Sequence, residues 1–230
     1  MKELLFVITM ACAATVQAFS IWDLISSRTP NFDEIKDSNQ RKNAFFTYLL
    51  PMVKKENNKI KQVRSLIKNN QFNDMQIKKL AKKYRIKHVD KNALLNTIDT
   101  IPASLVLAQA AIESNWGNSR FSKHHNNYFG LWCFKPGCGV VPKDRNKGAK
   151  HEVMSFSSVN KSIEYYLLNL NRNHAYSLLR QIRAYKRQHN LKLTGVSLSE
   201  GLEKYSEIGY EYIELVQSII RQNKLSRFDY

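Results

Sequence analysis

The sequence is poor in acidic residues: 19 aspartates and glutamates stand against 36 lysines and arginines, which gives a formal charge of +17. This balance indicates an anionic partner or surface, a class that includes nucleic acid, acidic lipid and cell-wall polymer. Internal repeats and low-complexity linkers are also missing, which excludes a repeat array and a loosely tethered module. With 43% hydrophobic residues, the 230-residue chain can form one large domain, or one domain with a helical extension.

Long apolar runs are absent except at the N-terminus. An apolar stretch at residues 4–16 follows Lys2, and residues 16–18 (Val-Gln-Ala) have the small side chains of a cleavage site. We therefore predict a signal peptide at residues 1–18 and an exported protein of the periplasm or cell envelope, with no stable membrane span after cleavage. An uncleaved membrane anchor is the alternative, although the stretch is short for a span. Export argues against a nucleic-acid partner, for which the sequence has no recognised motif.

Cysteine is scarce, and only Cys133 and Cys138 remain once the predicted signal peptide is removed. An even number of cysteines in an exported chain predicts a disulfide. The alternative is a metal site that combines these cysteines with His124, His125 or His151. Structural zinc sites usually show two closely spaced ligand pairs, and this chain has one cysteine pair. We therefore expect no metal and no cofactor.

Helical spacing of apolar residues is the main pattern along the chain. Residues 19–90 are predicted to form an N-terminal basic helical extension of a few amphipathic helices, with Pro51 between two of them, and residues 91–230 form the main domain. Glycines, prolines and short apolar runs between residues 126 and 156 predict loops and a small β-hairpin. The predicted fold class is mainly α with one small β element.

One acidic residue lies in a predicted helix that is otherwise apolar. Proline suits the first position of a helix and glycine the C-terminal cap, so the helix is expected to begin at Pro102 and end at Gly117, with Glu113 in its last turn. There the helix dipole and the apolar neighbours both raise the expected pKa of the carboxyl group. Gln109 and Trp116 share its helix face by their spacing. A carboxyl group that keeps its proton suits cleavage of a glycosidic bond. The alternative is an acid that pairs with one of the many basic residues.

Five segments of the sequence resemble one family. AQAAIESNWGNSRF, NNYFGLWCF, PGCGVVP, KGAKHEV and YSEIG are similar to the Bax-type exported proteins, a branch of the glucosaminidase family that includes the flagellar rod-cap domain and the cell-separating autolysins. The similarity covers nearly all of the mature chain. It implies a lysozyme-like helical fold and a β-N-acetylglucosaminidase that cleaves the β-1,4 bond after N-acetylglucosamine in peptidoglycan glycan strands.

The resemblance also implies roles for individual residues. Glu113 matches the catalytic general acid of the family, and Tyr205 resembles a tyrosine that the family places beside the scissile bond. The proline and second tyrosine that usually follow this tyrosine are replaced here. The candidate substrate-binding residues are Gln109, Trp116, Asn127, Tyr128, Phe129 and Trp132. Ordinary core packing is the alternative for the aromatic residues among them.

The second catalytic group stays open. The wider family carries a glutamate on the first strand of the hairpin, but residues 139–142 contain no acid here. Glu152 on the second strand, Asp144 and the acetamido group of the substrate are the candidates. Two other functions fit the same sequence: a lytic transglycosylase, which also works with one acid, and a catalytically inactive module that binds the cell wall or assists assembly.

Overall fold

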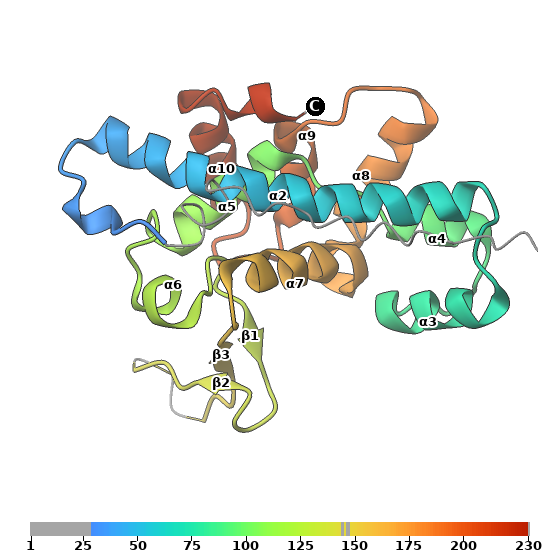
Figure 1. Ribbon diagram of the computed structural model, residues 1–230, viewed down its shortest axis with the longest axis horizontal. Helices are drawn as coiled ribbons and strands as arrows, with labels where there is room; N and C mark the ends of the chain where they lie inside the picture. The colour runs from blue at the N-terminus through green and yellow to red at the C-terminus, as the bar shows by residue number, and fades with distance from the viewer. Residues whose placement is uncertain (1–28, 144, 146–147, 230) are drawn as a thin grey trace, which may run out of the picture.

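The structure is a computed structural model that describes residues 29–143, 145 and 148–229. The predicted signal peptide and Asp144 lie outside the described residues. In chain order the elements are η1 (Phe32–Glu34), α2 (Ser38–Lys68), α3 (Asp74–Tyr84), α4 (Lys91–Thr97), α5 (Ala103–Glu113), α6 (Arg120–His125), β1 (Trp132–Cys133), β2 (Gly139–Val140), β3 (Glu152–Met154), α7 (Val159–Arg172), η2 (His174–Tyr176), α8 (Ser177–Gln188), α9 (Gly195–Ser199), η3 (Glu200–Leu202), α10 (Tyr210–Gln222) and η4 (Leu225–Phe228). The helices form one body, and the small sheet projects from it (Figure 1).

The predicted fold class is confirmed, with one addition in the β element. The predicted hairpin is present as β2 and β3, and a third strand, β1, pairs antiparallel with the other edge of β3. Val153 is the central residue of this sheet, because Trp132 is its partner on one side and Val140 on the other. The sequence pattern missed β1 because the strand is only two residues long.

Helix α2 runs without a break through Pro51, where the sequence pattern indicated separate helices. A proline inside a helix removes one hydrogen bond and disfavours the preceding turn. Here Phe45, Leu49 and Val53 are fully buried on the two sides of Pro51, and Ile60 continues the same stripe. Because both halves bury one face against the same core, packing outweighs the local cost of the proline.

Helix α5 lies at the centre of the molecule, in contact with α2, α9 and α10. All of its residues from Ala103 to Ala111 are buried, as expected of a helix that is apolar on every side. Pro102 is its N-cap and not its first residue, and Ser114 is its C-cap. The predicted end at Gly117 is therefore wrong, because Asn115 and Trp116 leave the helical conformation with φ values of +48° and +55°.

The N-terminal helices pack on the rest of the molecule. Buried residues of α2 belong to the same apolar cluster as those of α5, α7 and α10. The described part of the chain has no helix that is both long and apolar enough to cross a membrane.

Candidate active site

A cleft of about 710 Å³ opens where α5 ends. Glu113 contributes to one wall, and residues 129–132, which lead into β1, lie next to it. The other walls come from α7, from η2 and from residues 204–208, which precede α10. Segments that are far apart in the sequence therefore meet around the last residue of one buried helix.

The Glu113 carboxyl group is partly buried, and it forms no ion pair with any described residue. Burial raises its pKa above the ordinary value, and a hydrogen bond from the Tyr212 hydroxyl, 2.6 Å from Oε1, only partly offsets this rise. The shift has the direction that the sequence predicts. It favours a carboxyl group that retains a proton at a higher pH than an exposed glutamate does.

A chain of three buried hydrogen bonds leads to Glu113. The Tyr166 hydroxyl donates to Oε1 of Gln109, Nε2 of Gln109 donates to the Tyr212 hydroxyl at 2.9 Å, and Tyr212 donates to Glu113. Gln109 is fully buried and does not line the cleft, and its side chain contacts the two tyrosines. Because the Gln109 amide donates to Tyr212, the hydroxyl proton of Tyr212 is directed at Glu113 Oε1.

The loop at residues 127–131 brings a glycine against the other carboxylate oxygen. The Asn127 amide holds this loop, because it donates to the carbonyls of Leu131 at 3.0 Å and Met154 at 2.9 Å. Gly130 has a φ of +58°, and a Cβ at this position would lie 3.0 Å from Glu113 Oε2. A glycine is therefore required both by the backbone conformation and by the space that the carboxyl group occupies.

Tyr205 lines the cleft beside the acid. Its ring stacks on that of Tyr212, with ring centroids 5.4 Å apart and planes at 9°. Its hydroxyl donates to the carbonyl of Phe129 at 2.9 Å, across the cleft wall. Burial raises the pKa of Tyr205 well above its usual value, so the hydroxyl keeps its proton and remains a donor.

Two of the predicted aromatic residues, Phe129 and Trp132, line the cleft. Phe129 is buried and stacks on Tyr166 with ring centroids 4.1 Å apart. Trp132 is 50% exposed, and its ring stacks on the ring of His151 at 3.9 Å. Phe134, which the sequence analysis did not single out, is 72% exposed and lines the same cleft.

Trp116 and Tyr128 lie elsewhere. Both pack against Phe45 of α2, with ring centroids 5.7 Å and 6.1 Å from it. Neither lines the cleft. Trp116 does not lie on the helix face that carries Gln109 and Glu113, because α5 ends before it and its own φ is +55°. For these two residues the structure agrees with the alternative of core packing.

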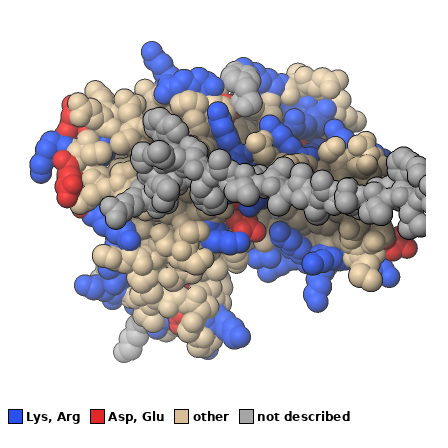
Figure 2. Space-filling model, viewed as in Figure 1, with Lys and Arg blue, Asp and Glu red and all other residues tan. Residues whose placement is uncertain are grey.

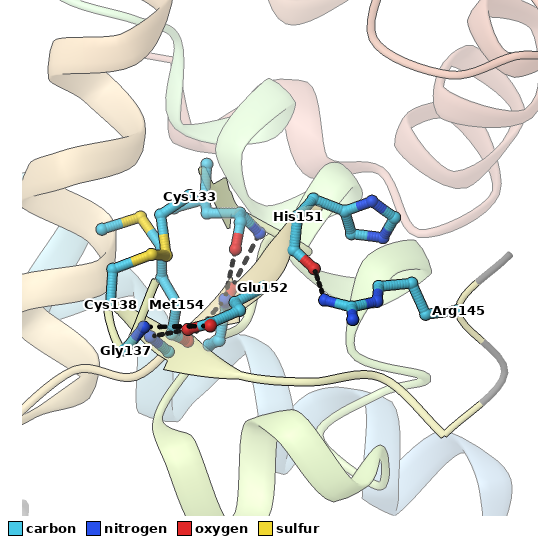
Figure 3. Close-up of a disulfide and its surroundings, with 10 residues drawn as sticks. Cys133, Gly137, Cys138, Arg145, His151, Glu152 and Met154 are labelled. Atoms are coloured by element: carbon cyan, nitrogen blue, oxygen red, sulfur yellow. Dashed lines mark hydrogen bonds between the residues drawn. A yellow bond between two sulfur atoms is a disulfide. The ribbon is translucent and has the colours of Figure 1, made fainter. Parts of the chain in front are cut away.

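Cys133 and Cys138 form the predicted disulfide, with their Cα atoms 6.2 Å apart. Both sulfurs are used in this bond, so the alternative metal site would lack its thiolates. The Glu152 carboxylate points into the loop that the disulfide closes (Figure 3). It accepts hydrogen bonds from the backbone N–H groups of Gly137 at 3.0 Å and Gly139 at 2.8 Å, which lower its pKa. Glu152 does not line the cleft.

Three residues of the site have no signal in the local sequence pattern. Tyr166 and Tyr212 complete the hydrogen bonds behind Glu113, and Glu207 contributes a second carboxyl group to the cleft. Tyr212 is 99 positions from Glu113 in the sequence, so only the packing of α10 on α5 brings the two together.

Comparison with known proteins assigns the class. The sequence pattern of the Glucosaminidase family, described as mannosyl-glycoprotein endo-beta-N-acetylglucosaminidase, matches residues 91–225, and the chain belongs to this family of glycoside hydrolases. The predicted resemblance is thereby confirmed. The chain is 30% identical over 212 residues to protein bax of Escherichia coli, an alignment that covers 86% of this chain and 76% of that protein.

Two solved structures are also similar. One is the catalytic domain of the autolysin Auto from Listeria monocytogenes, with a TM-score of 0.49 and 19% identity over 92% of this chain and 98% of its own. The other is a C-terminally truncated glycoside hydrolase domain of FlgJ from Salmonella typhimurium, with a TM-score of 0.38 and 23% identity over 54% of this chain and 84% of its own.

Proposed function

We propose that the protein is an exported peptidoglycan hydrolase that cleaves the β-1,4 bond after N-acetylglucosamine, with Glu113 as the general acid. One observation carries this proposal: a carboxyl group with a raised pKa borders an open cleft and forms no ion pair with the described residues. Membership of the Glucosaminidase family supports the class of bond. Protonation of the leaving oxygen is the step that such a group can perform.

The hydrogen bonds around Glu113 determine which of its oxygens carries the proton. Tyr212 donates to Oε1, so the acidic hydrogen resides on Oε2. Gly130 has no side chain beside Oε2, which leaves space on the cleft side of this oxygen. The glycosidic oxygen then approaches Oε2, takes its proton and leaves as a hydroxyl group, while Glu113 becomes a carboxylate that accepts the bond from Tyr212.

The rim of the cleft has the side chains that sugars require. Trp132 and Phe134 are exposed aromatic rings, against which the apolar faces of a sugar can pack. Asn169 and Asn173, whose amides are hydrogen-bonded to each other at 3.2 Å, add polar groups to the lining. The volume of about 710 Å³ lies within the range of about 300–1,000 Å³ that is usual for ligand sites.

The charge of the molecule suits a polyanionic envelope. Basic side chains lie in several groups on the face that Figure 2 shows, whereas acidic ones are few. The exposed lysines of α2 and α3 contribute to the excess of +17 for the whole chain. An attraction of this kind raises the local concentration of an anionic polymer without specifying the bond to be cut.

Mass spectrometry of peptidoglycan digested with the purified protein tests this proposal. We expect products with reducing N-acetylglucosamine ends, and Glu113→Gln should release none while circular dichroism shows that it is folded. Anhydromuramic ends would identify a lytic transglycosylase. Absence of products with the wild-type protein, combined with binding to the polymer, would identify an inactive wall-binding module. Either result would overturn the proposed function.

A further inference from the structure

The part of the chain that the structure describes places one carboxyl group besides Glu113 in the cleft. Among the described residues that line it, only Glu113 and Glu207 are acidic. The Glu152 carboxylate is bound to the backbone of the disulfide loop and lies outside the lining. Hydrolysis of a glycoside by direct displacement requires a second carboxylate that activates water. Glu207 is therefore the described residue that fits this requirement.

The segment that carries Glu207 is fixed relative to Glu113. Tyr205, two residues earlier, donates to the carbonyl of Phe129 and stacks on Tyr212, which is itself bonded to Glu113. The backbone around Glu207 is closed by a hydrogen bond from Gly209 N–H to the carbonyl of Ser206 at 3.2 Å. The contacts of Tyr205 thus connect the turn that bears the second carboxyl group to the wall that bears the first.

The two carboxyl groups differ in their surroundings. Glu113 is partly buried and receives a hydrogen bond, whereas Glu207 is exposed, and no described residue holds its carboxylate by a hydrogen bond or an ion pair. A free carboxylate at the edge of a cleft can bind a water molecule. A carboxylate that already accepts hydrogen bonds from backbone N–H groups binds water less readily.

We propose that Glu207 is the general base that activates the attacking water, a role that rests on the proposed function of Glu113. Glu207 takes one proton from water as the water oxygen bonds to the anomeric carbon. The bond between that carbon and the leaving oxygen breaks, its electron pair stays on the oxygen, and this oxygen takes the proton of Glu113. One water is consumed, two sugar hydroxyl ends form, and solvent returns the proton from Glu207 to Glu113. The attack from the opposite face inverts the anomeric configuration.

Kinetics of Glu207→Gln on purified peptidoglycan test the proposal, with Glu203→Gln as the matched control. Glu203 is an exposed acid four positions earlier that does not line the cleft. We expect kcat to fall about 100-fold in Glu207→Gln, with unchanged circular dichroism and thermal midpoint, and to stay at the wild-type value in Glu203→Gln. Wild-type kcat in Glu207→Gln beside an inactive Glu113→Gln would overturn the role of Glu207.

The anomeric configuration of the first product is a second measurement that tests the proposal. Nuclear magnetic resonance of a soluble glycan fragment should show that the wild type forms the α anomer first, and azide should restore turnover to Glu207→Ala as an α-glycosyl azide. Formation of the β anomer first would overturn the proposal and favour the acetamido group of the substrate as the nucleophile. If the wild type releases no reducing N-acetylglucosamine ends at all, it is the proposed function of Glu113 that fails.

Discussion

A carboxyl group lies near each end of helix α5, and the pKa values of the two groups are shifted in opposite directions. Asp99, just before the helix, is 1% exposed and lies near three arginines: Arg187 Nε at 3.0 Å, Arg64 Nε at 3.2 Å and Arg183 Nε at 3.9 Å. Burial alone would raise its pKa, but the arginines together hold it below the ordinary value. Glu113, at the other end, has a tyrosine hydroxyl as its partner and a raised pKa.

Burial by itself therefore does not decide what a carboxyl group does. Cationic partners keep Asp99 ionised and make it a structural anchor, since Arg64 comes from α2 and the other two arginines from α8. Arg183 also donates to the carbonyls of Asn96 and Thr97, where α4 ends. Neutral partners leave the pKa of Glu113 raised, which is the property that the proposed general acid requires. The comparison predicts that loss of Asp99 damages the fold and that loss of Glu113 damages activity.

The largest expected effect is on the rate of hydrolysis. Glu113→Gln keeps the shape of the side chain and removes its acidic proton, so the initial rate of glycan cleavage should fall about 10³-fold. Release of reducing ends over time measures this rate. Asp99→Asn is the comparison variant, and its folded fraction should retain the rate. A fall below about tenfold in Glu113→Gln would contradict the assignment of the general acid.

The largest effect on stability should come from the other acid. Asp99→Asn leaves Arg183, which is fully buried, without its anionic partner, and breaking such a buried network costs about 3–5 kcal/mol. Chemical denaturation monitored by circular dichroism measures the free energy of unfolding. Asp74→Asn, at an exposed position in the first turn of α3, is the matched control. If Asp99→Asn lowers the free energy of unfolding by less than about 1 kcal/mol, the predicted structural role of Asp99 is contradicted.

Glu113 also differs from Asp99 in its hydrogen-bond donor, which is the neutral hydroxyl group of Tyr212. Its hydrogen bond lowers the pKa of Glu113, so Tyr212→Phe should raise this pKa further. The general acid must be protonated, and the alkaline limb of the pH–rate profile should therefore move to higher pH. At the optimum, the rate should fall about tenfold because the carboxyl group loses its orientation. Tyr210→Phe, an exposed tyrosine on the same helix, should change neither quantity.

The smallest expected effect is an opposite pH dependence of stability at the two ends. The folded-state pKa of Glu113 is raised, so its contribution to stability is present below the unfolded-state pKa and is lost as pH rises through the folded-state pKa. Glu113→Gln should therefore gain thermal stability relative to the wild type as pH rises. The pKa of Asp99 is lowered, so its contribution is lost only as pH falls through the folded-state value. Thermal midpoints measured across the pH range test both signs.

Patterns within one stretch of chain predict much of this molecule. The helical spacing of apolar residues predicts a mainly helical chain, and the described residues form one. The even cysteine count predicts the disulfide. The buried helix with one acid is also evident from sequence, because an apolar helix needs no knowledge of its neighbours to be recognised.

The rest depends on contacts between distant segments. Gly117, with a φ of +81°, lies so near the Phe32 ring that an added Cβ would be 2.4 Å from it. The bond from Tyr212 and the exposure of Glu207 to the same cleft arise from the packing of α10 and of the turn before it. The local periodicity of a sequence does not indicate which distant residues will be in contact.

The length of α2 has a consequence for where this protein can be divided. The family pattern begins at residue 91, yet α2, which ends at Lys68, provides Phe45, Leu49 and Val53 to the core that surrounds α5. A chain cut at residue 91 would expose that apolar surface to water and favour aggregation over folding. The segment that the family pattern matches is thus shorter than the segment that packs around one apolar core.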